Sequence, residues 1–194
     1  RTTLRLANAT VLPFDFKAFH RTVSGYQTEV MALIDNMREA TDVENMLIRD
    51  KRYAQAADPT EKTVLPATKE VVPFVSFTSL QNAIAHLEKS AASIADQLAA
   101  HPDPKQADAV NQLMYQAEQK LLSTQELPRR PWFKHTIYAP GYYTGYGVKT
   151  LPGIREAIEQ RSWNEAQEQI EIAAKSIQAY AAQIDAAATL LQNN

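Results

Sequence analysis

The sequence contains no cysteine among its 194 residues. This absence excludes disulfides, cysteine-based zinc sites, iron–sulfur clusters and a thiol nucleophile. Glycine is also scarce: there are five, and Gly141, Gly145 and Gly147 fall in one stretch. A chain with so little glycine, abundant alanine and few β-branched runs does not favour an all-β fold.

Long apolar runs and an excess of one charge are missing as well. No run of 18 apolar residues is present, so the sequence predicts no membrane contact from this segment. Lys and Arg total 20 while Asp and Glu total 22, a net charge of −2, which argues against a nucleic-acid partner. The chain begins Arg1-Thr2-Thr3-Leu4 without Met or a signal-peptide pattern, which we interpret as part of a longer polypeptide.

Four stretches repeat apolar residues at spacings of three and four, the pattern of amphipathic helices. They are Phe16, Phe19, Val23, Tyr26, Val30, Leu33 and Met37; Leu80, Ile84, Leu87, Ala91, Ile94 and Leu98; Val110, Met114, Ala117 and Leu121; and Ile170, Ala173, Ile177, Tyr180, Ile184, Ala187 and Leu191. Burying these stripes together predicts an all-α fold, an up-down four-helix bundle, in a single domain over residues 1–194. The expected helices cover residues 15–41, 77–101, 105–126 and 153–192, and long loops cover 42–75 and 127–151.

Several residues predict where these helices begin and end. Asp15 is a suitable N-cap for the first helix, and Ser162 with Glu165 forms a capping-box pattern for the last. The prolines in the short link 101–104 separate the second and third helices and predict that these are antiparallel neighbours. Loop 42–75 is expected to be an exposed excursion with a short helix within 43–57.

The loop at 127–151 has a different composition from an ordinary linker. It contains two aromatic residues, Trp132 and Phe133, followed by four tyrosines at positions 138, 142, 143 and 146. Long aromatic loops in compact domains are usually packed or functional. We therefore expect this loop to pack against the helices.

The search for catalytic or metal-binding residues finds none. None of the four histidines stands in a metal-binding motif, so no cofactor is predicted in this chain. Arg129 and Arg130 can bind an anion or stack on a base, but the favoured interpretation is an anchoring contact to helix-end carbonyls or to an acidic neighbour. We interpret Glu165, Glu168 and Glu171 as a solvated helix face, and Asn8-Ala9-Thr10 as a glycosylation pattern that is common by chance.

Three ordered segments resemble one family. They are Leu6-Ala7-Asn8 with Val11-Leu12-Pro13-Phe14-Asp15; Val75-Ser76-Phe77 with Ser79-Leu80; and Phe133-Lys134-His135-Thr136-Ile137-Tyr138-Ala139-Pro140 with Tyr146, Pro152-Gly153-Ile154 and Glu156-Ala157. Together they resemble the C-terminal helical domain of glutamate carboxypeptidase II and its relatives, the transferrin-receptor-like dimerisation domain. The resemblance runs from about residue 4 to about residue 188, and the excursion at 42–75 is longer here than in the family.

This resemblance implies partners that the helical pattern does not. In the family the domain follows an apical domain and a protease-like domain with two zinc ions, and it helps to form a homodimer. The zinc ligands and the catalytic glutamate lie upstream, so this chain is expected to be non-catalytic by itself. Relatives are often single-pass membrane proteins with the catalytic part outside the cytosol, so the resemblance implies a membrane-anchored parent with this domain on the extracytosolic side.

The resemblance also assigns a role to the aromatic loop. In peptidase members this loop reaches the substrate pocket and carries a Lys-Tyr pair that holds the C-terminal residue of the substrate. The matching positions here are Gly145 and Tyr146, so the tyrosine is kept and the cation is lost. The loss puts a strict preference for C-terminal glutamate, and peptidase activity itself, in doubt, because receptor-type members have no such activity. Packing of Tyr146 against the bundle is the alternative role, and for His135 a structural hydrogen bond is the favoured interpretation.

Two functional hypotheses follow. The first is a homodimerisation domain that docks on upstream protease-like and apical domains; the second is an independent helical adaptor with the loop as its ligand site. The last helix has more apolar residues than one narrow stripe requires, which predicts that it supplies the dimer interface. Ile172 lies off the core stripe and is the predicted contact.

Overall fold

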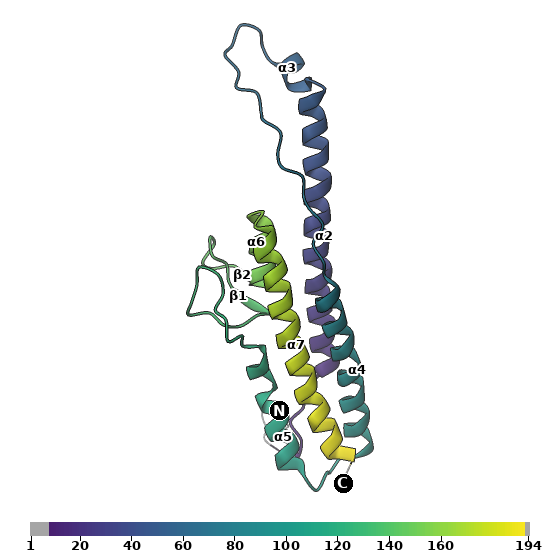
Figure 1. Ribbon diagram of the computed structural model, residues 1–194. Helices are drawn as coiled ribbons and strands as arrows, with labels where there is room; N and C mark the ends of the chain where they lie inside the picture. The colour runs from purple at the N-terminus through teal and green to yellow at the C-terminus, as the bar shows by residue number, and fades with distance from the viewer. Residues whose placement is uncertain (1–7, 193–194) are drawn as a thin grey trace.

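The structure is a computed structural model that describes residues 8–192, in which the chain is mainly helical (Figure 1). The helices are α2 (Phe16–Arg49), α3 (Arg52–Ala56), α4 (Thr78–Ala100), α5 (Ala107–Gln116), α6 (Pro152–Glu159) and α7 (Trp163–Gln192). A short 3-10 helix, η1 (Ala117–Leu121), continues α5, and strands β1 (Tyr138–Pro140) and β2 (Val148–Thr150) precede α6. The helical class expected from the sequence is confirmed.

Helix α7 lies at the centre of the molecule. It packs against α4 on one side and against α5, η1 and α6 on others (Figure 1). All seven residues of its predicted stripe are buried, together with Ala166, Ala174, Ala181 and Ala188. The wide apolar band of α7 is therefore accounted for by contacts within the chain. The sequence predicted that the second and third helices are direct neighbours. Instead, α4 and α5 both pack against α7 and lie on either side of it.

The other predicted stripes also form the core. The stripe residues of α4 are buried except the half-buried Leu98, and those of α5 and η1 are all buried. Near the start of α2, Phe16 and Phe19 meet Tyr180 with ring centroids 6.3 and 4.6 Å apart. Burial in this aromatic cluster raises the pKa of the Tyr180 hydroxyl. Asp15 caps α2 as predicted, because its side chain accepts a hydrogen bond from the Ala18 N–H at 2.8 Å.

Helix α2 is longer than the sequence predicted. It continues to Arg49 instead of ending at 41, and α3 follows directly, so the predicted excursion begins as helix. Figure 1 shows the far half of α2 projecting beyond the other helices, with the chain returning alongside it. Asn45 fixes this return, since its side chain donates to the Lys69 carbonyl and accepts from the Lys69 N–H, both at 2.8 Å. We name residues 35–74 the arm.

The predicted helix over 153–192 is wrong in one respect, because it consists of two helices. The chain turns between α6 and α7 at Arg161, which has a φ of 57°. The Arg161 side chain ties this turn to the neighbouring α2 and the returning chain. It donates to the Thr41 hydroxyl and, at 2.9 Å, to the Glu70 carbonyl. Ser162 immediately precedes α7, where the capping pattern placed it, and its carbonyl accepts from Ala166 N–H at 2.9 Å.

The third helix, predicted over 105–126, ends earlier, at Leu121. The chain leaves the helical conformation there because its backbone pairs with a later segment: Thr136 N–H donates to the Leu121 carbonyl at 3.0 Å and Ser123 N–H to the Lys134 carbonyl at 2.8 Å. These long-range bonds replace the last helical turn and fix the start of the aromatic loop. The beginning of the sequence resemblance, Leu6-Ala7, lies outside the described residues, and Asn8 is exposed.

Candidate functional site

The aromatic loop, residues 127–151, contains a small β-hairpin that the sequence did not predict. Strands β1 and β2 are antiparallel, with Tyr138 opposite Thr150 and Pro140 opposite Val148. Two glycines make the tight connection possible. Gly145 has a φ of +63°, which strains other residues, and a Cβ at Gly141 would lie 2.3 Å from the Thr144 hydroxyl. The glycines gathered in this loop therefore build its turn.

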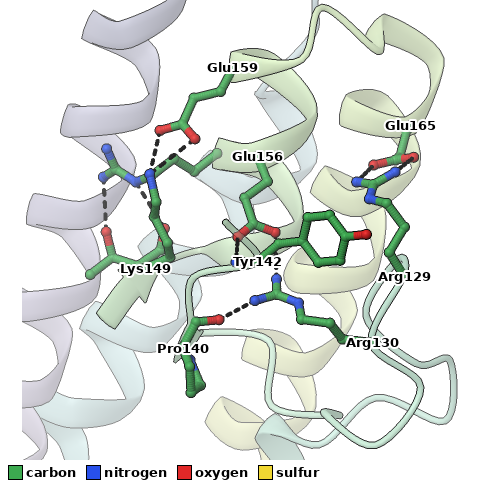
Figure 2. A network of polar contacts seen from close by, with 10 residues as sticks. Arg129, Arg130, Pro140, Tyr142, Lys149, Glu156, Glu159 and Glu165 are labelled. Atoms are coloured by element: carbon green, nitrogen blue, oxygen red, sulfur yellow. Dashed lines mark hydrogen bonds and ion pairs between the residues drawn. The ribbon is translucent and has the colours of Figure 1, made fainter. Parts of the chain in front are cut away.

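A buried ion pair anchors the hairpin to α6. Arg130 and Glu156 are 4% and 3% exposed, and the Arg130 guanidinium donates to the Glu156 carboxylate and to the Pro140 carbonyl (Figure 2). The other Glu156 oxygen accepts the Tyr142 N–H at 2.8 Å. Both charges are thus paired and hydrogen-bonded, which burial demands. The contact fixes the start of the turn that follows β1.

A second ion pair holds the start of the loop against α7. Arg129 donates to both Glu165 oxygens, at 2.7 and 3.0 Å, and its guanidinium lies 5.7 Å from the Tyr142 ring centroid (Figure 2). The hydrogen bond to Glu165 raises the pKa of Arg129. The anchoring interpretation of the arginine pair is confirmed. Glu165 is not part of a solvated face, because it is a half-buried partner of Arg129.

The second strand is held by charged contacts of its own. Lys149 donates to both oxygens of Glu159 on α6, at 2.7 and 3.0 Å (Figure 2). Next to it, Arg155 donates to Glu29 of α2 at 2.6 Å and to the Thr150 carbonyl at 3.2 Å. Lys149 is the one cation between residues 138 and 151, and it is already paired.

His135 connects the hairpin to η1. Its Nδ1 accepts the N–H groups of Ile137 and Tyr138 at 3.2 and 3.3 Å, so the proton of the neutral ring is assigned to Nε2, which donates to Glu118 at 3.1 Å. The Tyr138 hydroxyl donates to the same Glu118 oxygen at 2.9 Å, and this contact raises the pKa of Tyr138. The structural hydrogen-bonding role predicted for His135 is confirmed.

The side chains at the outside of the loop are exposed, although its backbone is held in place. Trp132 is 72% and Tyr143 is 75% exposed, and Tyr146 at the tip is fully exposed next to Gly145. The expectation that these aromatic residues pack against the helices is wrong for all three. Exposed aromatic groups on a fixed backbone are typical of surfaces that contact another molecule or domain.

Ile172, the predicted interface residue, lies away from Tyr146. It is half-buried and lines a shallow groove between α7 and the segment after η1, together with Leu122, Thr124 and Lys175. The structure therefore brings Gly145 and Tyr146 together, as adjacent residues of one turn, and leaves Ile172 on a different surface.

Sequence reasoning missed the role of Glu156 as a partner of Arg130. The sequence around Glu156 carries a signal of this role, because Glu156 is an acid in a short helix whose buried residues include Ile154, Ala157 and Ile158. A carboxylate on an apolar helix face requires a buried partner.

Two kinds of site are not found in the described part of the chain. Within residues 8–192, no group of three or more His, Asp or Glu side chains is placed to hold a metal ion. None of the helices formed by these residues has the length and apolarity needed to cross a membrane.

Comparison with known proteins identifies the same family that the sequence motifs of the aromatic loop resemble. Residues 75–185 match the transferrin receptor-like dimerisation domain, which covers more than half of the chain. A probable glutamate carboxypeptidase of Arthroderma benhamiae is 28% identical over 174 residues, 89% of this chain and 20% of that protein. The Arabidopsis thaliana probable glutamate carboxypeptidase LAMP1 is 38% identical over 68 residues, 31% of this chain and 10% of that protein. The aligned part of the chain thus spans at most a fifth of these relatives, and the chain belongs to the transferrin receptor-like dimerisation domain family.

Proposed function

We propose that this chain is the C-terminal homodimerisation domain of a glutamate carboxypeptidase II-like zinc metallopeptidase. In this proposal α2, α4, α5 and α7 form an up-down bundle that supports the aromatic loop, and the loop borders the substrate pocket of the larger protein. The family match and the names of the relatives support the dimeric and peptidase parts of the proposal.

One observation carries the role of the loop: Tyr146 is fully exposed although ion pairs fix the backbone around it. A side chain presented in this way can meet a group supplied by another domain without first ordering the loop, which lowers the entropic cost of the contact. The Tyr146 hydroxyl would donate a hydrogen bond to a substrate carboxylate. Gly145 supplies no cation beside it.

The zinc ions of such an enzyme would lie outside this chain. The described residues offer no cluster of ligands for them, so this proposal places two zinc ions and the catalytic glutamate in an upstream protease-like domain. The partners of this chain are then its second copy and the upstream protease-like and apical domains. A membrane-anchored parent would hold the domain on the extracytosolic side.

The dimer part is tested by sedimentation equilibrium at micromolar concentrations. A mass of twice 21.7 kDa is expected, and a monomer at all concentrations would favour the adaptor hypothesis. Ile172→Glu tests the contact predicted from the sequence. Unchanged folding and dimerisation in this variant would remove Ile172 from the interface.

The loop part is tested in the full-length protein by Tyr146→Phe. Loss of a hydrogen bond to a carboxylate, worth about 1.5–3 kcal/mol, would raise KM for peptide substrates by roughly 10–150-fold with a smaller change in kcat. Tyr143→Phe, another exposed hydroxyl of the same loop, serves as the matched control. Equal kinetic constants for wild type and Tyr146→Phe would contradict the role of Tyr146, and absence of hydrolysis by the wild type would favour a receptor-type member.

A further inference from the structure

An apolar groove lies at the base of the arm, between α2 and the segment that leads into α4. It has a volume of about 280 Å³ and is lined by Met31, Ile34, Asp35, Arg38, Phe74, Val75 and Phe77. Ile34, Val75 and Phe77 are buried and form its inner wall. The groove is therefore a preformed apolar depression where the arm joins the helical core.

Phe74 stands beside this groove with 87% of its surface exposed. The backbone around it is fixed: the Pro73 carbonyl accepts from Arg38 at 3.2 Å, and the Ser76 N–H and carbonyl both bond to the Gln167 side chain, at 3.0 and 3.1 Å. Phe74 is thus held out from the surface rather than left on a loose chain. Val71, three residues earlier, is also exposed.

Phe74 and the groove together form a surface patch with the two features that a symmetric contact needs, a protrusion and a depression. A two-fold interface brings one surface against its own copy, so each protrusion must face a depression of the same patch. Here an exposed phenylalanine adjoins an apolar groove. The rim carries an acid and a base, Asp35 and Arg38, that form an exposed pair at 2.7 Å and can exchange partners across a two-fold axis.

We propose that a second copy of this chain docks on this patch, with Phe74 of each copy in the groove of the other. The inference rests on the proposed homodimer and names the surface that forms it. Phe74 immediately precedes the residues that match the dimerisation-domain family, so the whole arm lies before them. The arm then contributes its own surface to the association of the two copies.

The size and charge of the arm agree with this occupant. Two phenylalanines bury roughly 150–250 Å² each, about a quarter of the approximately 1,600 Å² of a standard interface. Further apolar surface is exposed on the arm at Val43, Met46, Val64, Leu65 and Val71. The arm has six basic and eight acidic residues, so repulsion between two arms is weak.

Cysteine pairing tests the docking directly, because the chain has no cysteine of its own. Met31→Cys and Phe74→Cys proteins would be mixed and oxidised with oxidised glutathione. The proposal expects a disulfide-linked dimer from the mixture, formed at least tenfold faster than from either variant alone. The proposal would be overturned if the mixture formed no disulfide-linked dimer, or formed it no faster than either variant alone.

A second measurement separates this inference from the proposed function. In sedimentation equilibrium of the full-length protein, Phe74→Glu is expected to weaken dimerisation at least tenfold, while Tyr115→Glu, an exposed aromatic position on α5, leaves it unchanged. A wild-type dimer that Phe74→Glu does not weaken would overturn the docking surface alone. A monomeric wild type would overturn the homodimer as well. Circular dichroism confirms that each variant is folded.

Discussion

The aromatic loop and the arm both leave the helical core, but they are fixed by different contacts. In the loop, Arg130 forms a buried ion pair with Glu156, and Arg129 and Lys149 form two further ion pairs with the helices. In the arm, the returning segment is fixed mainly by hydrogen bonds to its backbone from Arg38, Asn45 and Arg161. The loop is therefore held rigidly around the fully exposed Tyr146, whereas the arm is held at a few points along a long exposed segment.

This difference indicates how each region can act. A rigid loop can position a hydroxyl accurately, because the cost of ordering it is met during folding. A long arm with exposed apolar side chains covers more area and suits association. A substitution that removes contacts in only one of the two regions therefore tests this difference.

The largest effect is expected for Glu156→Ala. This change leaves the Arg130 charge buried without its partner and removes the acceptor of the Tyr142 N–H. Breaking a buried pair costs about 3–5 kcal/mol, so the free energy of unfolding measured by urea denaturation should fall by that amount. Glu165→Ala is the matched control, since it breaks the half-exposed Arg129 pair and should cost about 1 kcal/mol or less. Equal losses in the two variants would refute the buried anchor.

A smaller effect is expected in the arm for Asn45→Ala. The variant loses both hydrogen bonds to the Lys69 backbone, worth about 1–3 kcal/mol together. Hydrogen exchange should show faster exchange of the Lys69 amide, with the Tyr142 amide in the loop unaffected. Asn36→Ala, at an exposed position of the same helix, should change neither. Parallel loss of protection at both amides would mean that the arm and the loop unfold together.

The smallest effect is a dependence on alkaline pH. Glu118 raises the pKa of Tyr138 in the loop, Glu44 raises that of Tyr53 in the arm, and burial raises that of Tyr180 in the core. A raised pKa means that the folded protein keeps a proton that the unfolded chain loses above about pH 10. The contribution of these tyrosines to stability is therefore fully present below that pH and is lost as pH rises through their folded-state pKa values.

Single Tyr→Phe variants at these three positions show which tyrosine causes the loss of stability at alkaline pH. Denaturation at several pH values above about 10 should show the greatest recovery of stability for Tyr180→Phe, because Tyr180 is the buried one of the three. A loss that is unchanged in Tyr180→Phe would show that its ionisation does not set the alkaline limit.

The helical core was predictable because its signal is periodic. The stripes of α4, α5 and α7 and the Asp15 cap depend on residues three or four apart, whose relative positions a helix determines. The family was also predictable, since it depends on ordered motifs in and around the aromatic loop. The anchoring of Arg129 and Arg130 was the favoured interpretation of the sequence, but their partners Glu165 and Glu156 were not identified from it.

Other features depend on contacts between distant segments. The third helix ends at Leu121 because its backbone pairs with Thr136, and the predicted last helix is interrupted at Arg161, whose side chain reaches Thr41. The exposure of Trp132, Tyr143 and Tyr146 was not predictable either. Aromatic residues indicate burial, and the sequence does not tell whether the burying surface belongs to the same domain.

The sequence by itself determined that the chain is helical, which residues form most of its core, and which family it resembles, because these depend on local spacing and motif order. Only the tertiary structure decided that α7 lies at the centre, that the far half of α2 projects as part of the arm, and that Arg130 pairs with Glu156. Arg130 and Glu156 are 26 positions apart, and their pair becomes buried only after the helices have packed around it.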